Sequence, residues 1–116
     1  MSSAVPVSNP EPNLLILQGD IDLHASPRVR EAASLLLEKQ IPRILVDLGG
    51  VTYMDSSGIA VLIETMQLSQ NYGGQLALFA IPQRVRAVFE IAQLDQVLDL
   101  YPDKASAQAG RAKNEG

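Results

Sequence analysis

The sequence predicts one α/β domain in which strands and helices alternate along the chain. Short continuous apolar runs, typical of strands buried in a parallel sheet, alternate with segments whose apolar residues recur every three or four positions. The 116 residues match the size of one domain. With 47% hydrophobic but only 4% aromatic residues, the chain can build a single core, and that core must be mostly aliphatic.

The N-terminal part predicts an edge strand followed by a buried strand. Residues 1–13 contain three prolines, so we expect only a short edge strand at residues 5–7, where Val5 and Val7 could pair as a hairpin with the next strand. Leu14–Leu17 is a continuous apolar run followed by Gly19, which predicts a strand buried on both faces.

A first helix is expected from Ser26 to about Lys39. Ser26 is a suitable N-cap, Pro27 suits the first helical position, and Pro42 prevents the helix from continuing. Its apolar residues lie on one stripe: Val29, Ala32, Ala33, Leu36 and Leu37.

The middle of the chain predicts a second buried strand and a second helix. The strand covers residues 44–48, and we expect Gly49-Gly50 to break it, leaving residues 51–54 as a short extended link. The helix is indicated by the stripe Ile59, Leu62, Ile63 and Met66, and Gly73-Gly74 supplies its left-handed cap.

The last third predicts a third buried strand at residues 75–79, a third helix opened by Pro82 and a short strand at Val97-Leu98. A last helical turn follows, and we expect frayed ends at residues 1–4 and about 108–116. The whole chain, residues 1–116, then forms one domain. Its sheet is mixed and mostly parallel, with four to five strands and helices mainly on one face.

Composition excludes several function classes. The net charge is −4 and the pI about 4.8, so the chain lacks the basic stripe with which proteins contact nucleic-acid phosphates, and we expect no direct nucleic-acid binding. There is no cysteine and one histidine, which removes thiolate catalysis and the usual zinc sites. We expect no membrane span, no secretory signal, no cofactor and a cytoplasmic protein.

The most distinctive segment is Asp55-Ser56-Ser57-Gly58, where an extended segment meets a helix start. The simplest interpretation is structural: Asp55 or a serine caps the helix, and Gly58 permits tight packing. A functional interpretation stands beside it. A phosphate on a serine there would meet unpaired amides at the positive end of the helix dipole, so the site suits a phosphorylation switch.

Catalytic and metal interpretations are weaker. Asp22, His24 and Ser56 could form a triad, but the Gly-x-Ser-x-Gly pattern is absent, and an Asp two residues from the His lies beside the ring rather than behind it. Asp20 and Asp22 are two carboxylates without a third ligand, which is a poor cation signal. We therefore expect neither catalytic nor metal-binding residues.

Three segments together resemble the STAS domain, the family of sulfate transporters and anti-sigma factor antagonists. They are Gly19-Asp20-Ile21-Asp22, residues 44–48, and Tyr53-Met54-Asp55-Ser56-Ser57-Gly58-Ile59-Ala60-Val61-Leu62. The resemblance runs from about Val5 to about Ala107. It departs at Ala60, where many members have a second glycine, and in the proline-rich start.

The resemblance implies partner switching. An unphosphorylated antagonist binds an anti-sigma factor that is also a serine kinase, a sigma factor is released, phosphorylation ends the contact, and a serine phosphatase resets the cycle. The regulatory serine is the one directly after the aspartate, here Ser56, and Asp22 matches the acidic residue near it. The partner-binding residues implied are Asp22, Asp55, Ser56, Ser57 and Gly58. The alternative is a STAS scaffold or regulatory subunit that is not phosphorylated, in a stress-sensing complex or lipid-transport machinery.

Overall fold

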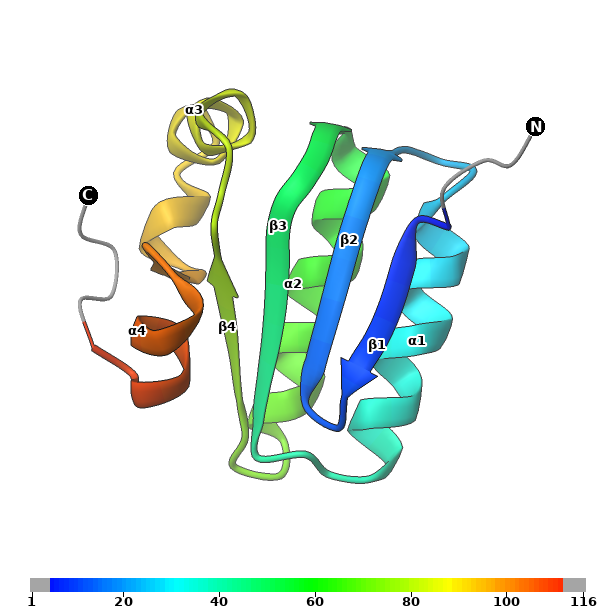
Figure 1. Cartoon of the computed structure of the whole chain (residues 1–116), viewed down its shortest axis with the longest axis vertical. Helices are drawn as coiled ribbons and strands as arrows, with labels where there is room; N and C mark the ends of the chain where they lie inside the picture. The colour runs from blue at the N-terminus through cyan, green and yellow to red at the C-terminus, as the bar shows by residue number, and fades with distance from the viewer. Residues whose placement is uncertain (1–4, 112–116) are drawn as a thin grey trace.

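Five strands form one sheet in the order β1-β2-β3-β4-β5 in the computed structural model, which describes residues 5–111 (Figure 1). The strands are β1 (Val7–Glu11), β2 (Leu14–Ile21), β3 (Arg43–Met54), β4 (Gln75–Phe79) and β5 (Asp99–Tyr101). β1 pairs antiparallel with β2, and the other three pairings are parallel. The predicted mixed and mostly parallel sheet is therefore confirmed.

Helices cover both faces of this sheet unequally. They are α1 (Ser26–Glu38), α2 (Ser56–Gln70), α3 (Gln83–Ile91) and α4 (Lys104–Ala109), with a short 3-10 turn, η1 (Leu94–Gln96). Figure 1 shows α1 and α2 behind the sheet and α4 beside β4, and Ala107 of α4 belongs to a core separate from that of α1 and α2. α3 adds Val85 and Phe89 to the core shared with α1 and α2. The helices thus pack mainly on one face, as the sequence predicts, and α4 covers part of the other.

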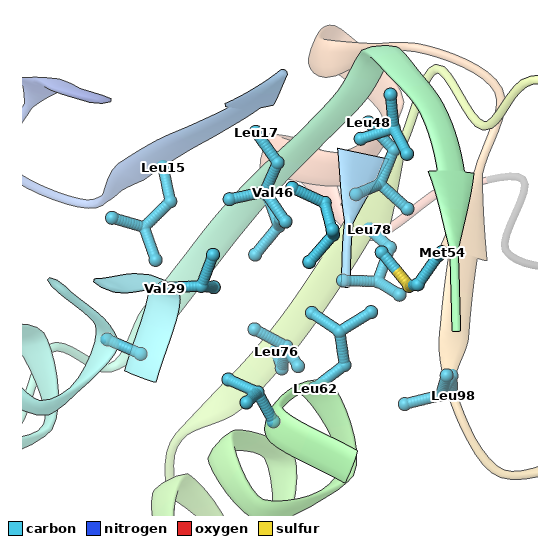
Figure 2. Close-up of a cluster of buried hydrophobic side chains, with 14 of the residues drawn as sticks. Leu15, Leu17, Val29, Val46, Leu48, Met54, Leu62, Leu76, Leu78 and Leu98 are labelled. Carbon is cyan, nitrogen blue, oxygen red and sulfur yellow. The ribbon is translucent and has the colours of Figure 1, made fainter. Parts of the chain in front are cut away.

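Alternate residues of the central strands enter two different cores. Leu17, Val46 and Leu78, from β2, β3 and β4, enter the larger core under α1 and α2 (Figure 2). Leu14, Leu45, Ala77 and Phe79, at intervening positions of the same strands, form a smaller core with Tyr101 of β5 and Ala107 of α4. Burial on both faces explains why these strands read as continuous apolar runs rather than alternating ones.

The expectation that Gly49-Gly50 ends the second buried strand is wrong. β3 runs from Arg43 through both glycines to Met54, so the expected extended link is strand. Ile16 pairs with Asp47 and Gln18 with Gly50, which is two steps along β2 but three along β3. The extra residue is a bulge, and a bulge accommodates glycines without ending the strand.

Other boundaries also differ from the prediction. β1 begins at Val7 and includes Pro10, which an edge strand tolerates. β2 continues past Gly19, whose φ of +74° fits a local irregularity in the register, and reaches Ile21. The last strand is residues 99–101 rather than 97–98, because the amides of Val97 and Leu98 both donate to the carbonyl of Leu94 in the η1 turn.

Helix ends were predicted to within a few residues. The N-cap of α1 is Ala25 rather than Ser26, which is buried within the helix. Gly73 adopts a φ of +82°, as expected of the left-handed residue after α2. The predicted last helical turn is confirmed as α4, so residues 108 and 109 are helical rather than frayed. The expected frayed residues 1–4 and 112–116 lie outside the described residues.

Candidate functional site

The Asp22 loop and the Asp55-Ser56 turn meet at one edge of the sheet, the upper edge in Figure 1. β2 and β3 are parallel neighbours, so the segments that follow their carboxyl ends lie together. The backbone amide of Asp55 donates to the carbonyl of Ile21 at 3.3 Å, which ties the two segments directly. Asp22 therefore lies at the same end of the sheet as Ser56, near it as the family resemblance implies.

Asp55 organises the start of α2. Its carboxylate accepts from the backbone amides of Ser57 at 2.9 Å and Gly58 at 3.3 Å, and from the Ser57 hydroxyl at 2.5 Å. These bonds, with the Ser57 hydroxyl contributing most and the backbone amide of Leu23 contributing as well, hold the pKa of Asp55 below its usual 3.8. Asp55 is therefore an ionised N-cap that also contacts the loop after β2.

The two serines of the motif differ in access. Ser57 is half-buried, and its hydroxyl is occupied by Asp55. Ser56 is exposed, and within residues 5–111 its hydroxyl has no hydrogen-bond partner. A modifying enzyme can therefore approach Ser56 without breaking a hydrogen bond, whereas Ser57 must first leave the cap.

Gly58 is buried inside the turn and takes no part in the exposed surface. A Cβ at this position would lie 2.8 Å from the carbonyl oxygen of Ile21 and 2.9 Å from the Met54 side chain. Real Cβ atoms do not approach this closely, so only glycine allows α2 to start against the end of β2. Its contribution to a partner surface is through the position of the serines.

Asp22 shapes the loop that leads into α1. Its carboxylate accepts from the backbone amides of His24 at 3.0 Å and Ala25 at 3.1 Å, as an aspartate in a turn commonly does. Within residues 5–111 no hydrogen bond joins this carboxylate to the His24 imidazole. The geometry gives no support to a triad of Asp22, His24 and Ser56.

Two exposed apolar side chains lie next to the segments that carry Asp22 and Ser56. Neither of them was predicted as a site residue from the sequence. Leu23 is 72% exposed and follows Asp22, and Tyr53 is 51% exposed and precedes Asp55 by two residues. Tyrosine is enriched in protein interfaces, so Tyr53, together with the neighbouring Leu23, is a candidate for contact with a protein partner. For Leu23 the sequence did offer a signal, since a leucine between Asp22 and His24 in a short polar loop has no place in the core.

The carboxylates at this edge already have protein partners. Asp20 accepts from the Thr52 hydroxyl at 2.6 Å, and across residues 5–111 no three histidine, aspartate or glutamate side chains gather as a metal site. In the same part of the chain no helix has the length and apolar character required to cross a bilayer. The arrangement offers an exposed hydroxyl framed by acidic and apolar groups.

Comparison with known proteins identifies similar chains. The STAS domain family model matches residues 5–107. The anti-sigma-B factor antagonist of Listeria monocytogenes is 29% identical over 86 residues, 74% of this chain and 75% of that protein. That of Bacillus subtilis (strain 168) is 32% identical over 84 residues, 72% of this chain and 76% of that protein. A solved anti-sigma factor antagonist from Mycobacterium paratuberculosis superposes with a TM-score of 0.76 at 22% identity, covering 90% of this chain and 89% of that one.

Proposed function

Because this chain belongs to the STAS domain family, we propose that it acts as an anti-sigma factor antagonist in a partner-switching cycle. Unphosphorylated protein binds an anti-sigma factor with serine kinase activity, and a sigma factor is freed. The kinase phosphorylates Ser56, the complex separates, and a serine phosphatase restores the first state. The chain itself catalyses nothing in this cycle. Two relatives that are anti-sigma-B factor antagonists, matched over about three quarters of their length, support the role.

The observation that carries the proposal is the contrast between the two adjacent hydroxyls. Ser56 is exposed at the first residue of α2, whereas the Ser57 hydroxyl is held by Asp55 at 2.5 Å. The regulatory serine implied by the family is the accessible one. Around it, Asp22, Leu23 and Tyr53 supply charge and apolar contact area for a partner.

The structure changes the expected effect of a phosphate. The amides of Ser57 and Gly58 already bind Asp55, so they are not free to receive a phosphate as the sequence suggested. A phosphoryl group on Ser56 adds about −1.5 to −2 charges beside the ionised Asp55. A partner that covers this phosphate must remove its hydration water or place it near another negative charge. Both cost free energy, so phosphorylation should oppose complex formation.

The test is a binding titration of Ser56→Asp. Each serine-kinase-type anti-sigma factor encoded in the source genome is purified and titrated with wild-type protein by calorimetry. We expect one of them to bind wild type, and to bind Ser56→Asp about a hundredfold more weakly, about 2.8 kcal/mol. The matched control is Ser8→Asp, which adds the same charge to an exposed serine of β1 and should bind like wild type. Equal affinity of both variants for that partner contradicts the switch.

A second measurement tests the modification itself. Incubation of the bound anti-sigma factor with ATP and the wild-type chain should place one phosphate on Ser56, mapped by mass spectrometry. Phosphate on Ser57 alone, or on neither serine, contradicts the assignment and favours a STAS scaffold that is not phosphorylated.

A further inference from the structure

The end of β3, just before the candidate site, contains a second bulge. Gly19 pairs with Val51 and Asp20 with Tyr53, which is one step along β2 but two along β3. Thr52 is therefore the extra residue, without a paired residue on β2. A bulge redirects the side chains that follow it, and bulges are frequent next to functional sites.

The burial of β3 shows what this bulge does. Side chains of a regular strand alternate between the two faces of the sheet, so residues 51 and 54 would lie on opposite faces. Here Val51 and Met54 both enter the larger core, 4% and 5% exposed, and Figure 2 shows Met54 in that core. The extra residue has shifted the alternation by one position. Tyr53 is consequently left exposed, and Asp55 leaves the strand directly after a buried residue.

Asp20 holds the bulged residue in place. The Thr52 hydroxyl donates to the Asp20 carboxylate at 2.6 Å, and this bond connects β3 to β2 at the bulge. An ionised acceptor makes such a bond shorter and stronger than one between neutral groups. The carbonyl of Thr52 has a longer contact, 3.5 Å from the guanidinium of Arg84 on α3. The hydroxyl bond is therefore the closer of the two contacts that hold the bulge.

The same two strand ends lead into the candidate site. Asp22 follows the last residue of β2, and Ser56 follows β3 by two residues. The backbone bond between these segments, from the Asp55 amide to the Ile21 carbonyl, is long at 3.3 Å. The backbone of β2 is itself irregular here, because Gly19 has a φ of +74°. The relative placement of the two segments therefore depends on the side-chain bond as well as on backbone pairing.

We propose that Asp20 and Thr52 are positioning residues, which fix the Asp55-Ser56 turn relative to the Asp22 loop by holding the bulge. Within residues 5–111 neither forms a hydrogen bond with Ser56, so they act through the strand ends. The importance of this placement for phosphorylation rests on the proposed function, in which one kinase contacts Asp22 and Ser56 together. Both positioning side chains are exposed, so substitutions there should leave the domain folded.

Amide hydrogen exchange of the full chain, followed by NMR, tests the placement without any kinase. Thr52→Val removes the donor but keeps the branched shape, and Asp20→Ala removes the acceptor. Each should raise the exchange rate of the Asp55 amide by about threefold or more, whereas amides of residues 44–48 in the middle of β3 should exchange as in wild type. Asp20→Asn keeps an acceptor oxygen and should also exchange like wild type.

The matched control is Ser34→Ala, which removes a hydroxyl bond of 2.8 Å on α1 and should leave the Asp55 amide unchanged. An Asp55 amide whose exchange is the same in Thr52→Val as in wild type overturns the proposal. So does an Asp20→Asn variant that exchanges as fast as Asp20→Ala.

Phosphorylation rates separate positioning from direct contact with the kinase. Thr52→Val and Asp20→Ala should slow phosphorylation of Ser56 by a similar factor, about threefold or more, and the double variant should be no slower, because all three lose the same bond. Thr52→Ser and Asp20→Asn can keep the bond and should react at nearly the wild-type rate.

The opposite pattern has a different cause. If Asp20→Asn is as slow as Asp20→Ala while Thr52→Val reacts normally, the charge of Asp20 contacts the kinase directly and the positioning role is wrong. A wild-type chain that no anti-sigma kinase phosphorylates contradicts the proposed function instead, and the exchange rates then decide the positioning role alone.

Discussion

Gly58 packs directly on the carbonyl oxygen of Ile21, so that a Cβ at position 58 would lie 2.8 Å from that oxygen. The contact joins the first turn of α2 to the end of β2, the two segments that carry Ser56 and Asp22. The amide of Asp55 bonds to the same carbonyl at 3.3 Å. The shape of the candidate partner surface therefore depends on one close backbone approach, and this approach can be tested by substitution.

Gly58→Ala should destabilise the fold. The added Cβ meets backbone at Ile21 as well as the Met54 side chain, and backbone cannot move aside as a flexible side chain can. Overpacking of this kind costs about 1–3 kcal/mol, which outweighs the gain of roughly 1 kcal/mol that alanine brings to a helix. Urea denaturation measures the free energy of unfolding of the variant and of wild type.

The control for Gly58→Ala is the reverse change two residues later. Ala60 is exposed on α2, so Ala60→Gly should lose only helix propensity, at most about 1 kcal/mol. A stable Gly58→Ala variant would mean that α2 can shift away from β2 at little cost.

Asp55→Asn should make the stability of the fold fall less as the pH is lowered. The pKa of Asp55 is lowered in the folded state, so its charge stabilises the fold above the unfolded value of 3.8, and this contribution is lost as the pH falls through the folded pKa. Asparagine keeps the side-chain oxygen that accepts from Ser57 and Gly58 but does not titrate there. Thermal melts from about pH 2 to about pH 7 should show a smaller drop for the variant than for wild type.

Asp103 provides an internal comparison for that pH series. It caps α4, and the backbone amide of Ser106, 2.8 Å from its carboxylate, lowers its pKa in the same direction. Asp103→Asn should therefore also reduce the fall in melting temperature between about pH 7 and about pH 2, and the double variant should show a smaller fall than either single variant. If neither substitution changes the loss of thermal stability at low pH, other carboxylates dominate that loss.

Most of the element order could be predicted from the sequence because the pattern of apolar residues reports burial. Strands buried on both faces read as continuous runs, and Leu45 and Val46, which face opposite cores, show why. The prediction that Gly49-Gly50 ends the strand was wrong because it depended on a non-local feature. Whether glycines end a strand or sit in a bulge depends on the neighbouring strand, and the register of β2 against β3 is not a local property of the sequence.

The candidate site was predictable in position but not in its hydrogen bonds. Two parallel strands and the residues after them suffice to bring Asp22 and Ser56 to one edge. The sequence left open whether Asp55 or a serine caps α2, because both residue types are good caps. The choice follows from the three-dimensional turn, in which Asp55 takes the amides of Ser57 and Gly58.

Asp22→Asn should separate charge from loop geometry. The asparagine oxygen can still accept from the amides of His24 and Ala25, so the free energy of unfolding should change by less than about 0.5 kcal/mol. Under the proposed function, loss of the charge beside Ser56 should nevertheless slow phosphorylation by the partner kinase. A normal rate with normal stability would leave Asp22 with a structural role only.

Asp22→Ala is the companion variant for this measurement. It removes both hydrogen bonds and should cost about 1 kcal/mol, the usual scale for a lost side-chain hydrogen bond. If the alanine and asparagine variants are phosphorylated at the same reduced rate, the charge acts on the kinase. If only the alanine variant is slow, the loop conformation is what the kinase requires.

Ser57→Ala should alter the N-cap formed by Asp55 without preventing the proposed phosphorylation of Ser56. Removing the hydroxyl takes away the largest influence that lowers the pKa of Asp55, so that pKa should rise toward 3.8, which an NMR titration of the carboxyl carbon detects. Ser56 stays exposed in this variant, so the phosphorylation that we propose for it should continue. Ser56→Ala should do the opposite, with the pKa of Asp55 still lowered and no phosphate accepted. A Ser57→Ala chain that is no longer phosphorylated, beside a Ser56→Ala chain that is, would move the regulatory hydroxyl to Ser57 and require the cap to open before the kinase acts.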